Sequence, residues 1–209
     1  WMTSHLSRAK LTAQSIALAG LAYPDPIVEK HLGEQNFGEW QGSSWKDMEA
    51  ADPDAYFEFW REPARNAPPG GESFADLIAR TADIIDRYTV DHAGEDIVAV
   101  CHGGTIRAAV AHVLGLTPEL GMSFTIDTLS VTRLEHVEGG LLRGKGGAWR
   151  IGAINQHSDT LGEELIADLL TLKGNHAVLP GKRAQLNELV NQIDRVIDLC
   201  SKGFADDAP

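Results

Sequence analysis

The sequence predicts an α/β fold, a three-layer α/β/α sandwich with a mostly parallel central sheet. The run Ile97-Val98-Ala99-Val100-Cys101 is continuously apolar and of strand length, which is typical of a buried parallel strand. Stretches with helical spacing of apolar residues precede and follow this run, so helices and strands alternate along the chain. Such alternation favours a sheet that is covered by helices on both faces.

The elements before the central strand are short and separated by glycine and proline. They are a strand end at residues 1–4, a helix at 8–19, an extended run at 27–32, an irregular segment at 33–42, and short helices at 45–51 and 55–60. Residues 66–71 then form a loop, after which Ser73 and Asp76 fit a capping box. The helix that they open has apolar residues at helical spacing, from Phe74 to Tyr88.

After the central strand, a helix is expected at residues 105–114 and two further strands at 129–137 and 149–154. The composition changes after Asn155, so we expect a domain at 1–155 and a helical extension at 156–209. An apolar stripe runs from Leu186 to Ile197 on the last predicted helix. This helix either packs on its own domain or forms the interface of a homodimer.

Composition excludes several classes of protein. The formal net charge of −12 argues against nucleic-acid binding and means that an anionic ligand needs a local concentration of positive charge. No apolar run reaches transmembrane length and no signal peptide opens the chain, so we expect no membrane partner. Cys101 and Cys200 make no disulfide scaffold, which favours a cytoplasmic location, and no Cys/His spacing suggests a metal site or another cofactor.

The junction His102-Gly103-Gly104-Thr105 is the strongest local candidate for a functional site. Ligands of α/β sheets bind beyond the carboxyl ends of strands, where a helix N-terminus offers free N–H groups to a phosphate. His102 could donate to a phosphate oxygen there, and glycines let the backbone approach a ligand. On the junction alone, His102 is as well explained by a capping or core role.

Two charged residues are further candidates. Arg8 follows a second strand-to-helix junction and is suited to bidentate phosphate contacts, although a solvated arginine in a first helical turn is the simpler alternative. Glu34 lies among glycines and aromatic residues, where a carboxyl group can serve as a general acid. Taken by itself, Glu39 is an equally good candidate for the acid.

Four motifs in the same order resemble the histidine phosphatase superfamily, the phosphoglycerate-mutase-like proteins. They are Thr3-Ser4-x-Leu6-x-Arg8-Ala9, Leu32-x-Glu34-x-x-Phe37-Gly38-x-Trp40-x-Gly42, Pro69-Gly70-Gly71-Glu72-Ser73 and Val100-Cys101-His102-Gly103-Gly104. The third motif is similar to the phosphatase branch. The run from Phe59 to Pro63, taken with the glycine loop, resembles α-ribazole-phosphate phosphatases.

The resemblance implies a metal-free phosphohistidine mechanism that acts on a small phosphorylated metabolite. Arg8, His102 and Gly103 would bind the phosphoryl group, Ser4 would support the pocket, and Glu34 would be the acid and base. The family's nucleophilic histidine belongs to an Arg-His-Gly motif on its first strand, and that motif does not occur in the 209 residues. Because the sequence also begins at Trp1, we expect a truncated chain that lacks the first strand and is inactive as printed.

Other activities remain as alternatives. A non-catalytic phosphate-binding or scaffolding protein is the main one, and phosphoryl transfer of the phosphoglycerate mutase type is the alternative within the family. A serine hydrolase lacks its Gly-x-Ser-x-Gly motif, and a phosphate-loop nucleotide enzyme lacks Gly-x-x-x-x-Gly-Lys-[Ser/Thr].

Overall fold

The computed structural model describes residues 1–18, 25–141 and 147–157. The helices expected within 156–209, and with them the candidate dimer interface from Leu186 to Ile197, lie outside the described residues. The fold and the site are therefore described for the first of the two expected segments.

Three short parallel strands form the sheet that positions the site, in the order β2-β1-β3. β1 is Met2–Ser4, β2 is Ile27–Glu29 and β3 is Ala99–Val100. Met2 lies opposite Ile27 on one side of β1 and opposite Ala99 on the other. Because β1 is the central strand, it is buried along its whole length.

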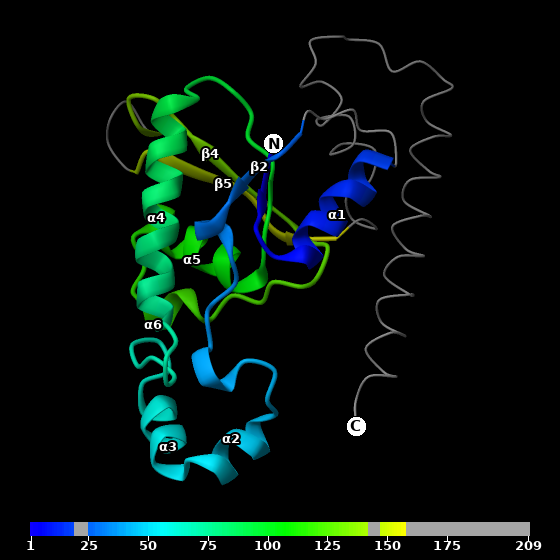
Figure 1. Ribbon diagram of the computed structural model, residues 1–209. Coiled ribbons are helices and arrows are strands. Elements are labelled where there is room, and N and C mark those ends of the chain that lie inside the picture. Colours follow the sequence, from blue (N-terminus) through cyan, green and yellow to red (C-terminus); the bar gives the residue numbers. More distant parts are fainter. Residues whose placement is uncertain (19–24, 142–146, 158–209) are drawn as a thin grey trace.

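Helices flank this sheet on both sides (Figure 1). α1 (Ser7–Leu18) lies on one side, while α4 (Phe74–Asp91) and α5 (Gly103–Leu114) pack against each other on the other side. A four-residue helix, α6 (Pro118–Gly121), packs against α5. The predicted α/β fold is therefore confirmed for the described part of the chain.

The last two described strands form a sheet of their own. β4 (Val131–His136) and β5 (Trp149–Gln156) pair antiparallel, with Val131 opposite Gln156 and His136 opposite Trp149. The sequence predicts one central sheet, whereas the described strands form two. Among the described residues, β4 and β5 are hydrogen-bonded to each other and not to β1, β2 or β3, so the antiparallel pair does not extend the parallel sheet.

The strand predicted over residues 97–101 is shorter and more exposed than expected. Only Ala99 and Val100 pair with β1, and Ile97 keeps 42% of its surface exposed. The prediction of a buried strand was therefore wrong in both extent and burial. β3 lies at an edge of the sheet that the described residues form, so β1 covers only one of its sides.

The segment between β2 and α4 forms a small helical lobe beyond the strands (Figure 1). Its elements are η2 (Gly38–Trp40), α2 (Trp45–Ala51) and α3 (Pro53–Arg61), whereas η1 (Lys30–Leu32), which comes before them, packs on β1 and α4. The predicted extended run ends at Glu29, because the Glu29 side chain accepts the His31 N–H and caps η1. Trp40, Met48 and Phe59 form the apolar core of the lobe.

α4 begins with the predicted capping box. Ser73 Oγ accepts from the Asp76 N–H at 3.1 Å, and Asp76 Oδ2 accepts from the Ser73 N–H at 3.0 Å. Behind this cap, Phe74 and Leu77 pack on Ala108 of α5. This core cluster fixes the beginning of α5, and so the candidate motif, relative to α4.

Candidate functional site

The predicted site residues gather at the carboxyl ends of β1 and β3, the edge of a parallel sheet where ligands bind. Ser4 is the last residue of β1, and Arg8 lies in the first turn of α1. His102 follows β3 and is the N-cap residue of α5. Glu34 reaches the same place from the loop after η1, where it contacts α5.

The His102 ring lies between the side chains of Arg8 and Ser4. Arg8 Nε donates to His102 Nδ1 at 3.3 Å, and His102 Nε2 lies 2.8 Å from Ser4 Oγ. Because Nδ1 accepts a hydrogen bond, the neutral ring carries its proton on Nε2 and donates it to Ser4. Among the described residues, His102 makes no side-chain capping bond, so the capping explanation of this residue does not hold.

The surroundings of His102 keep it neutral. Its burial and the positive charge of Arg8 lower the pKa of His102 to about 4. The tautomer also argues against Ser4 and His102 as a nucleophile and its base, because Nε2 already holds the proton that it would have to remove. In the Arg8–His102 contact, Arg8 is therefore the donor and His102 Nδ1 the acceptor.

Glu34, and not Glu39, lies beside Arg8 and His102. Glu34 Oε2 accepts from the Gly104 N–H at 3.2 Å and Oε1 accepts from the Gln35 N–H at 2.9 Å. Glu39 is exposed, and its side chain lies near Gly70 in the neighbouring loop. The positions of these two carboxylates therefore favour Glu34 over Glu39 as the candidate acid.

The two glycines of the motif have different surroundings. A Cβ atom at Gly104 would overlap Glu34 Oε1, so only glycine permits this carboxylate to reach the α5 backbone. A Cβ atom at Gly103 would meet its nearest neighbour, Ile126 O, at an ordinary 3.4 Å. The close approach expected at this helix terminus is therefore made by a carboxylate of the protein itself, and the Gly103–phosphate contact stays a prediction.

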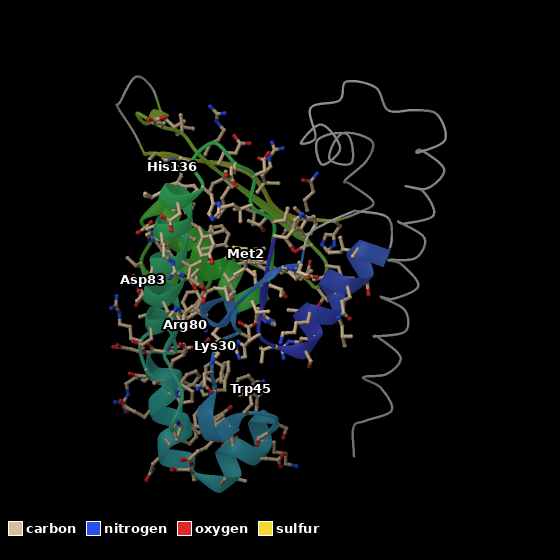
Figure 2. The ribbon with its side chains drawn as sticks, turned by 45° about the horizontal axis from the view of Figure 1, so that its top comes forward. Met2, Lys30, Trp45, Arg80, Asp83 and His136 are labelled. Carbon is tan, nitrogen blue, oxygen red and sulfur yellow. The ribbon has the colours of Figure 1, made fainter. Side chains whose placement is uncertain are left out.

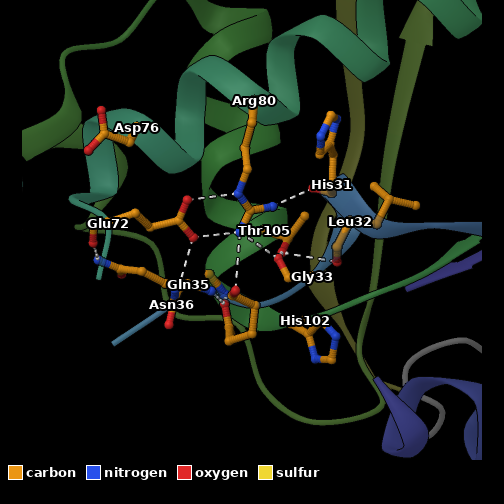
Figure 3. A network of polar contacts seen from close by, with 12 residues as sticks. His31, Leu32, Gly33, Gln35, Asn36, Glu72, Asp76, Arg80, His102 and Thr105 are labelled. Atoms are coloured by element: carbon orange, nitrogen blue, oxygen red, sulfur yellow. Dashed lines mark hydrogen bonds and ion pairs between the residues drawn. The ribbon is translucent and has the colours of Figure 1, made fainter. Parts of the chain in front are cut away.

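Sequence reasoning found Glu72 only as part of the third motif and missed Arg80, and these two residues hold the Glu34 loop. Arg80 of α4 and Glu72 form an ion pair at 2.7 Å and bind the backbone of this loop (Figure 3). Figure 2 shows Arg80 on the side of α4 near Lys30, and Asp83 on the outer side. Arg80 is one turn from Leu77, on the buried face of the helix, and an arginine at that position is a sign of a specific partner.

Two other groups near the motif have different environments. The Arg107 guanidinium lies over the Phe74 ring, 5.8 Å from its centroid, in a cation–π contact. Burial raises the pKa of the Cys101 thiol to about 12, so this thiol does not form a thiolate at neutral pH. Neither group joins the cluster around His102.

Within the described ranges, no group of three or more His, Cys, Asp or Glu side chains is arranged to hold a metal ion. No helix in this part of the chain is long and apolar enough to cross a membrane.

A family model agrees with this geometry. The model of the histidine phosphatase superfamily (branch 1) matches residues 1–143, which is more than half of the 209 residues. The chain belongs to the histidine phosphatase superfamily.

Relatives of the chain are phosphatases and mutases. The metal-independent phosphoserine phosphatase of Arabidopsis thaliana is 37% identical over 107 residues, which are 51% of this chain and 44% of that protein. The 2,3-bisphosphoglycerate-dependent phosphoglycerate mutase of Brucella anthropi is 35% identical over 121 residues, which are 56% of this chain and 58% of the mutase. The chain thus spans about half the length of the curated relatives that it matches.

Solved structures share the fold. Mycobacterial glucosyl-3-phosphoglycerate phosphatase in complex with inorganic phosphate is 30% identical with a TM-score of 0.58, over 75% of this chain and 76% of that one. The α-ribazole phosphatase of Shigella flexneri has a TM-score of 0.62 at 22% identity, over 75% of this chain and 73% of the other. At that identity the likeness to the α-ribazole phosphatase shows the fold alone.

Proposed function

We propose that this chain is part of a phosphomonoester hydrolase that acts on small phosphorylated metabolites through a phosphohistidine intermediate. The observation that carries the proposal is the convergence of Arg8, His102 and Glu34 at one edge of the parallel sheet. A cation, a hydrogen-bond donor and a carboxyl group are the parts that phosphoryl transfer to water needs beside its nucleophile.

Each residue has a distinct role in this proposal. Arg8 and His102 turn from each other to the phosphoryl oxygens and stabilise the charge that develops there, together with the Gly103 backbone. Ser4 is fully buried and acts on His102, not on the substrate. Glu34 protonates the leaving oxygen of the substrate and then removes a proton from the water that cleaves the phosphoenzyme.

The nucleophile comes from outside the printed sequence in this proposal. The family's Arg-His-Gly motif does not occur among the 209 residues, so we assign it to a segment that the longer protein supplies. That segment would also add the first strand of the expected three-layer sandwich.

Binding of inorganic phosphate to the chain as printed tests the pocket. We expect phosphate and vanadate to bind, and His102→Ala to abolish binding while the circular dichroism spectrum is unchanged. Unchanged affinity in His102→Ala would refute the assignment of this pocket.

Activity requires the longer protein. A form that carries the Arg-His-Gly segment should hydrolyse p-nitrophenyl phosphate, whereas the printed chain should not. Glu34→Gln in the active form should lower turnover by about 10²–10⁴-fold, the usual effect of losing a general acid. If turnover survived this change, Glu39 would become the better candidate for the acid.

Two other functions make different predictions in the same assays. A phosphate-binding or scaffolding protein would bind phosphate in both forms and hydrolyse nothing in either. A mutase would pass the phosphoryl group to a phosphoglycerate faster than to water. For the substrate we keep α-ribazole phosphate as the hypothesis from the Phe59–Pro63 run, to be compared with phosphoserine and glucosyl-3-phosphoglycerate.

A further inference from the structure

The Arg80–Glu72 pair differs in burial from surface ion pairs such as Arg65–Glu119. Its side chains keep only 20% and 19% of their surface exposed, so the pair is screened less than a surface pair. Arg80 Nε donates to Glu72 Oε2 at 2.9 Å and Nη2 donates to Oε1 at 2.7 Å. Such a two-pronged contact fixes direction as well as distance.

The remaining hydrogen bonds of the pair go to the backbone around Glu34. Arg80 Nη2 also donates to the carbonyl oxygens of Gly33 at 2.9 Å and Glu34 at 3.1 Å, and Nη1 donates to the carbonyl of His31. Figure 3 shows the guanidinium group reaching from α4 into this loop. One cation therefore holds the main chain at Glu34 and at the residue before it.

Glu72 holds the other side of Glu34. Its Oε1 atom accepts the Asn36 N–H at 2.9 Å, and its main-chain carbonyl accepts from Gln35 Nε2 at 3.0 Å. The Glu72 N–H donates in return to the Asn36 carbonyl at 2.9 Å. The chain is thus held by hydrogen bonds on both sides of Glu34, and all of these bonds come from the Arg80–Glu72 ion pair.

We propose that Arg80 and Glu72 are positioning residues for Glu34, because they hold its backbone so that the carboxylate reaches the Gly104 N–H beside His102. The inference rests on the proposed role of Glu34 as the acid and base. A general acid must lie within hydrogen-bond reach of the leaving oxygen, and small displacements of such a group are costly to the rate. Neither Arg80 nor Glu72 needs to touch the substrate for this role.

A second ion pair on α4 supplies a matched control. Arg87 lies two turns after Arg80 and donates from Nη2 to Glu29 Oε2 at 2.9 Å. The pair has the same chemistry and the same helix, but Arg87 is 53% exposed and its partner caps η1. Arg87→Lys therefore perturbs α4 without touching the hydrogen bonds around Glu34.

The test follows the Gly104 amide by ¹H–¹⁵N NMR as the pH is varied, in the chain as printed. Gly104 N–H donates to Glu34 Oε2, so its resonance should move as this carboxyl group titrates, and Glu34→Gln should remove the movement. In Arg80→Lys and in the nearly isosteric Glu72→Gln, the amplitude should fall by about half or more, because a lysine cannot make the two-pronged contact. Arg87→Lys should keep the full amplitude.

The outcomes separate positioning from general stability. Full amplitude in both Arg80→Lys and Glu72→Gln would overturn the proposal, as would an equal loss in Arg87→Lys. If Arg80→Lys loses the dispersion of a folded spectrum, Glu72→Gln decides. The titration needs no phosphate, so a chain that shows these changes and binds no phosphate would refute the proposed function and leave the positioning role intact.

Discussion

His102 is held between a cation and a hydroxyl group, and this determines how an anion binds. Both ring nitrogens have protein partners, so in the proposed pocket we expect an anion to replace the Arg8 contact at Nδ1 while the Ser4 contact at Nε2 stays. A ring that then donates from both nitrogens is protonated, and anion binding should therefore take up a proton.

Sulfate is the probe for this proton uptake, since its charge does not change in the range used. We expect its affinity to rise as the pH falls from 7 to 5.5, by up to about tenfold per pH unit for one linked proton. His102→Asn should lose the slope. A flat profile in the unchanged protein would contradict the exchange of partners at Nδ1.

The same residue makes stability depend on pH. The pKa of His102 is lowered from 6.5 to about 4 in the folded protein, so the unfolded chain binds more protons between these values. The free energy of unfolding should therefore decrease as the pH falls through this window, by about 2 kcal/mol between pH 7 and pH 5. Urea unfolding at both pH values checks this, and His102→Asn should show a smaller decrease.

The glycines of the α5 terminus give a matched pair of substitutions. Gly104→Ala places a Cβ atom on Glu34 Oε1 and should displace this carboxylate from the Gly104 N–H, at a cost of about 0.5–1.5 kcal/mol for the lost hydrogen bond. Gly103→Ala meets no atom closer than 3.4 Å and should leave the thermal unfolding midpoint nearly unchanged. Equal effects of the two substitutions would mean that Glu34 moves away without cost.

At the scale of elements, two helices carry the same cap in different surroundings. Ser73 caps α4 and is 3% exposed, whereas Ser44 caps α2 in an exposed position. Replacing Ser73 by alanine should cost about 1–2 kcal/mol, and Ser44→Ala less, because water can satisfy the N–H groups that an exposed cap leaves free. Chemical denaturation of the two variants measures the difference.

The elements that the sequence predicts best are those with local boundaries. The Ser73–Asp76 capping box fixes where α4 begins, and it depends on no distant residue. The strand over 97–101 was predicted less well, because its burial depends on which strands lie beside it. An apolar run identifies a strand, but its neighbours decide how much of it pairs.

In the candidate site, too, features set by the local sequence could be predicted and features set by distant residues could not. Arg8 and His102 could be predicted because strand ends and helix starts bring them to one edge of the sheet. Without the family resemblance, which favours Glu34, the choice between Glu34 and Glu39 could not be predicted, since it depends on how a loop folds over α5. Glu72 is visible in the sequence as part of the third motif, but Arg80 acts on backbone atoms and leaves no pattern beyond an arginine on a buried helix face.

At the scale of the whole molecule, the helical extension at 156–209 remains a prediction. If the stripe from Leu186 to Ile197 forms a homodimer, removing residues 181–209 should halve the mass in solution measured by light scattering. If the helix packs on its own domain, the mass should stay the same and the thermal unfolding midpoint should fall. No change in either quantity would contradict both interpretations.

The hydrogen bond from the Gly104 N–H to the Glu34 carboxylate also has a consequence for the release of inorganic phosphate in the proposed reaction. Inorganic phosphate is the second product of a phosphomonoesterase, and here it would compete with a tethered anion for the same helix terminus. We therefore expect weak product inhibition by phosphate, and stronger inhibition once Glu34 is replaced by glutamine.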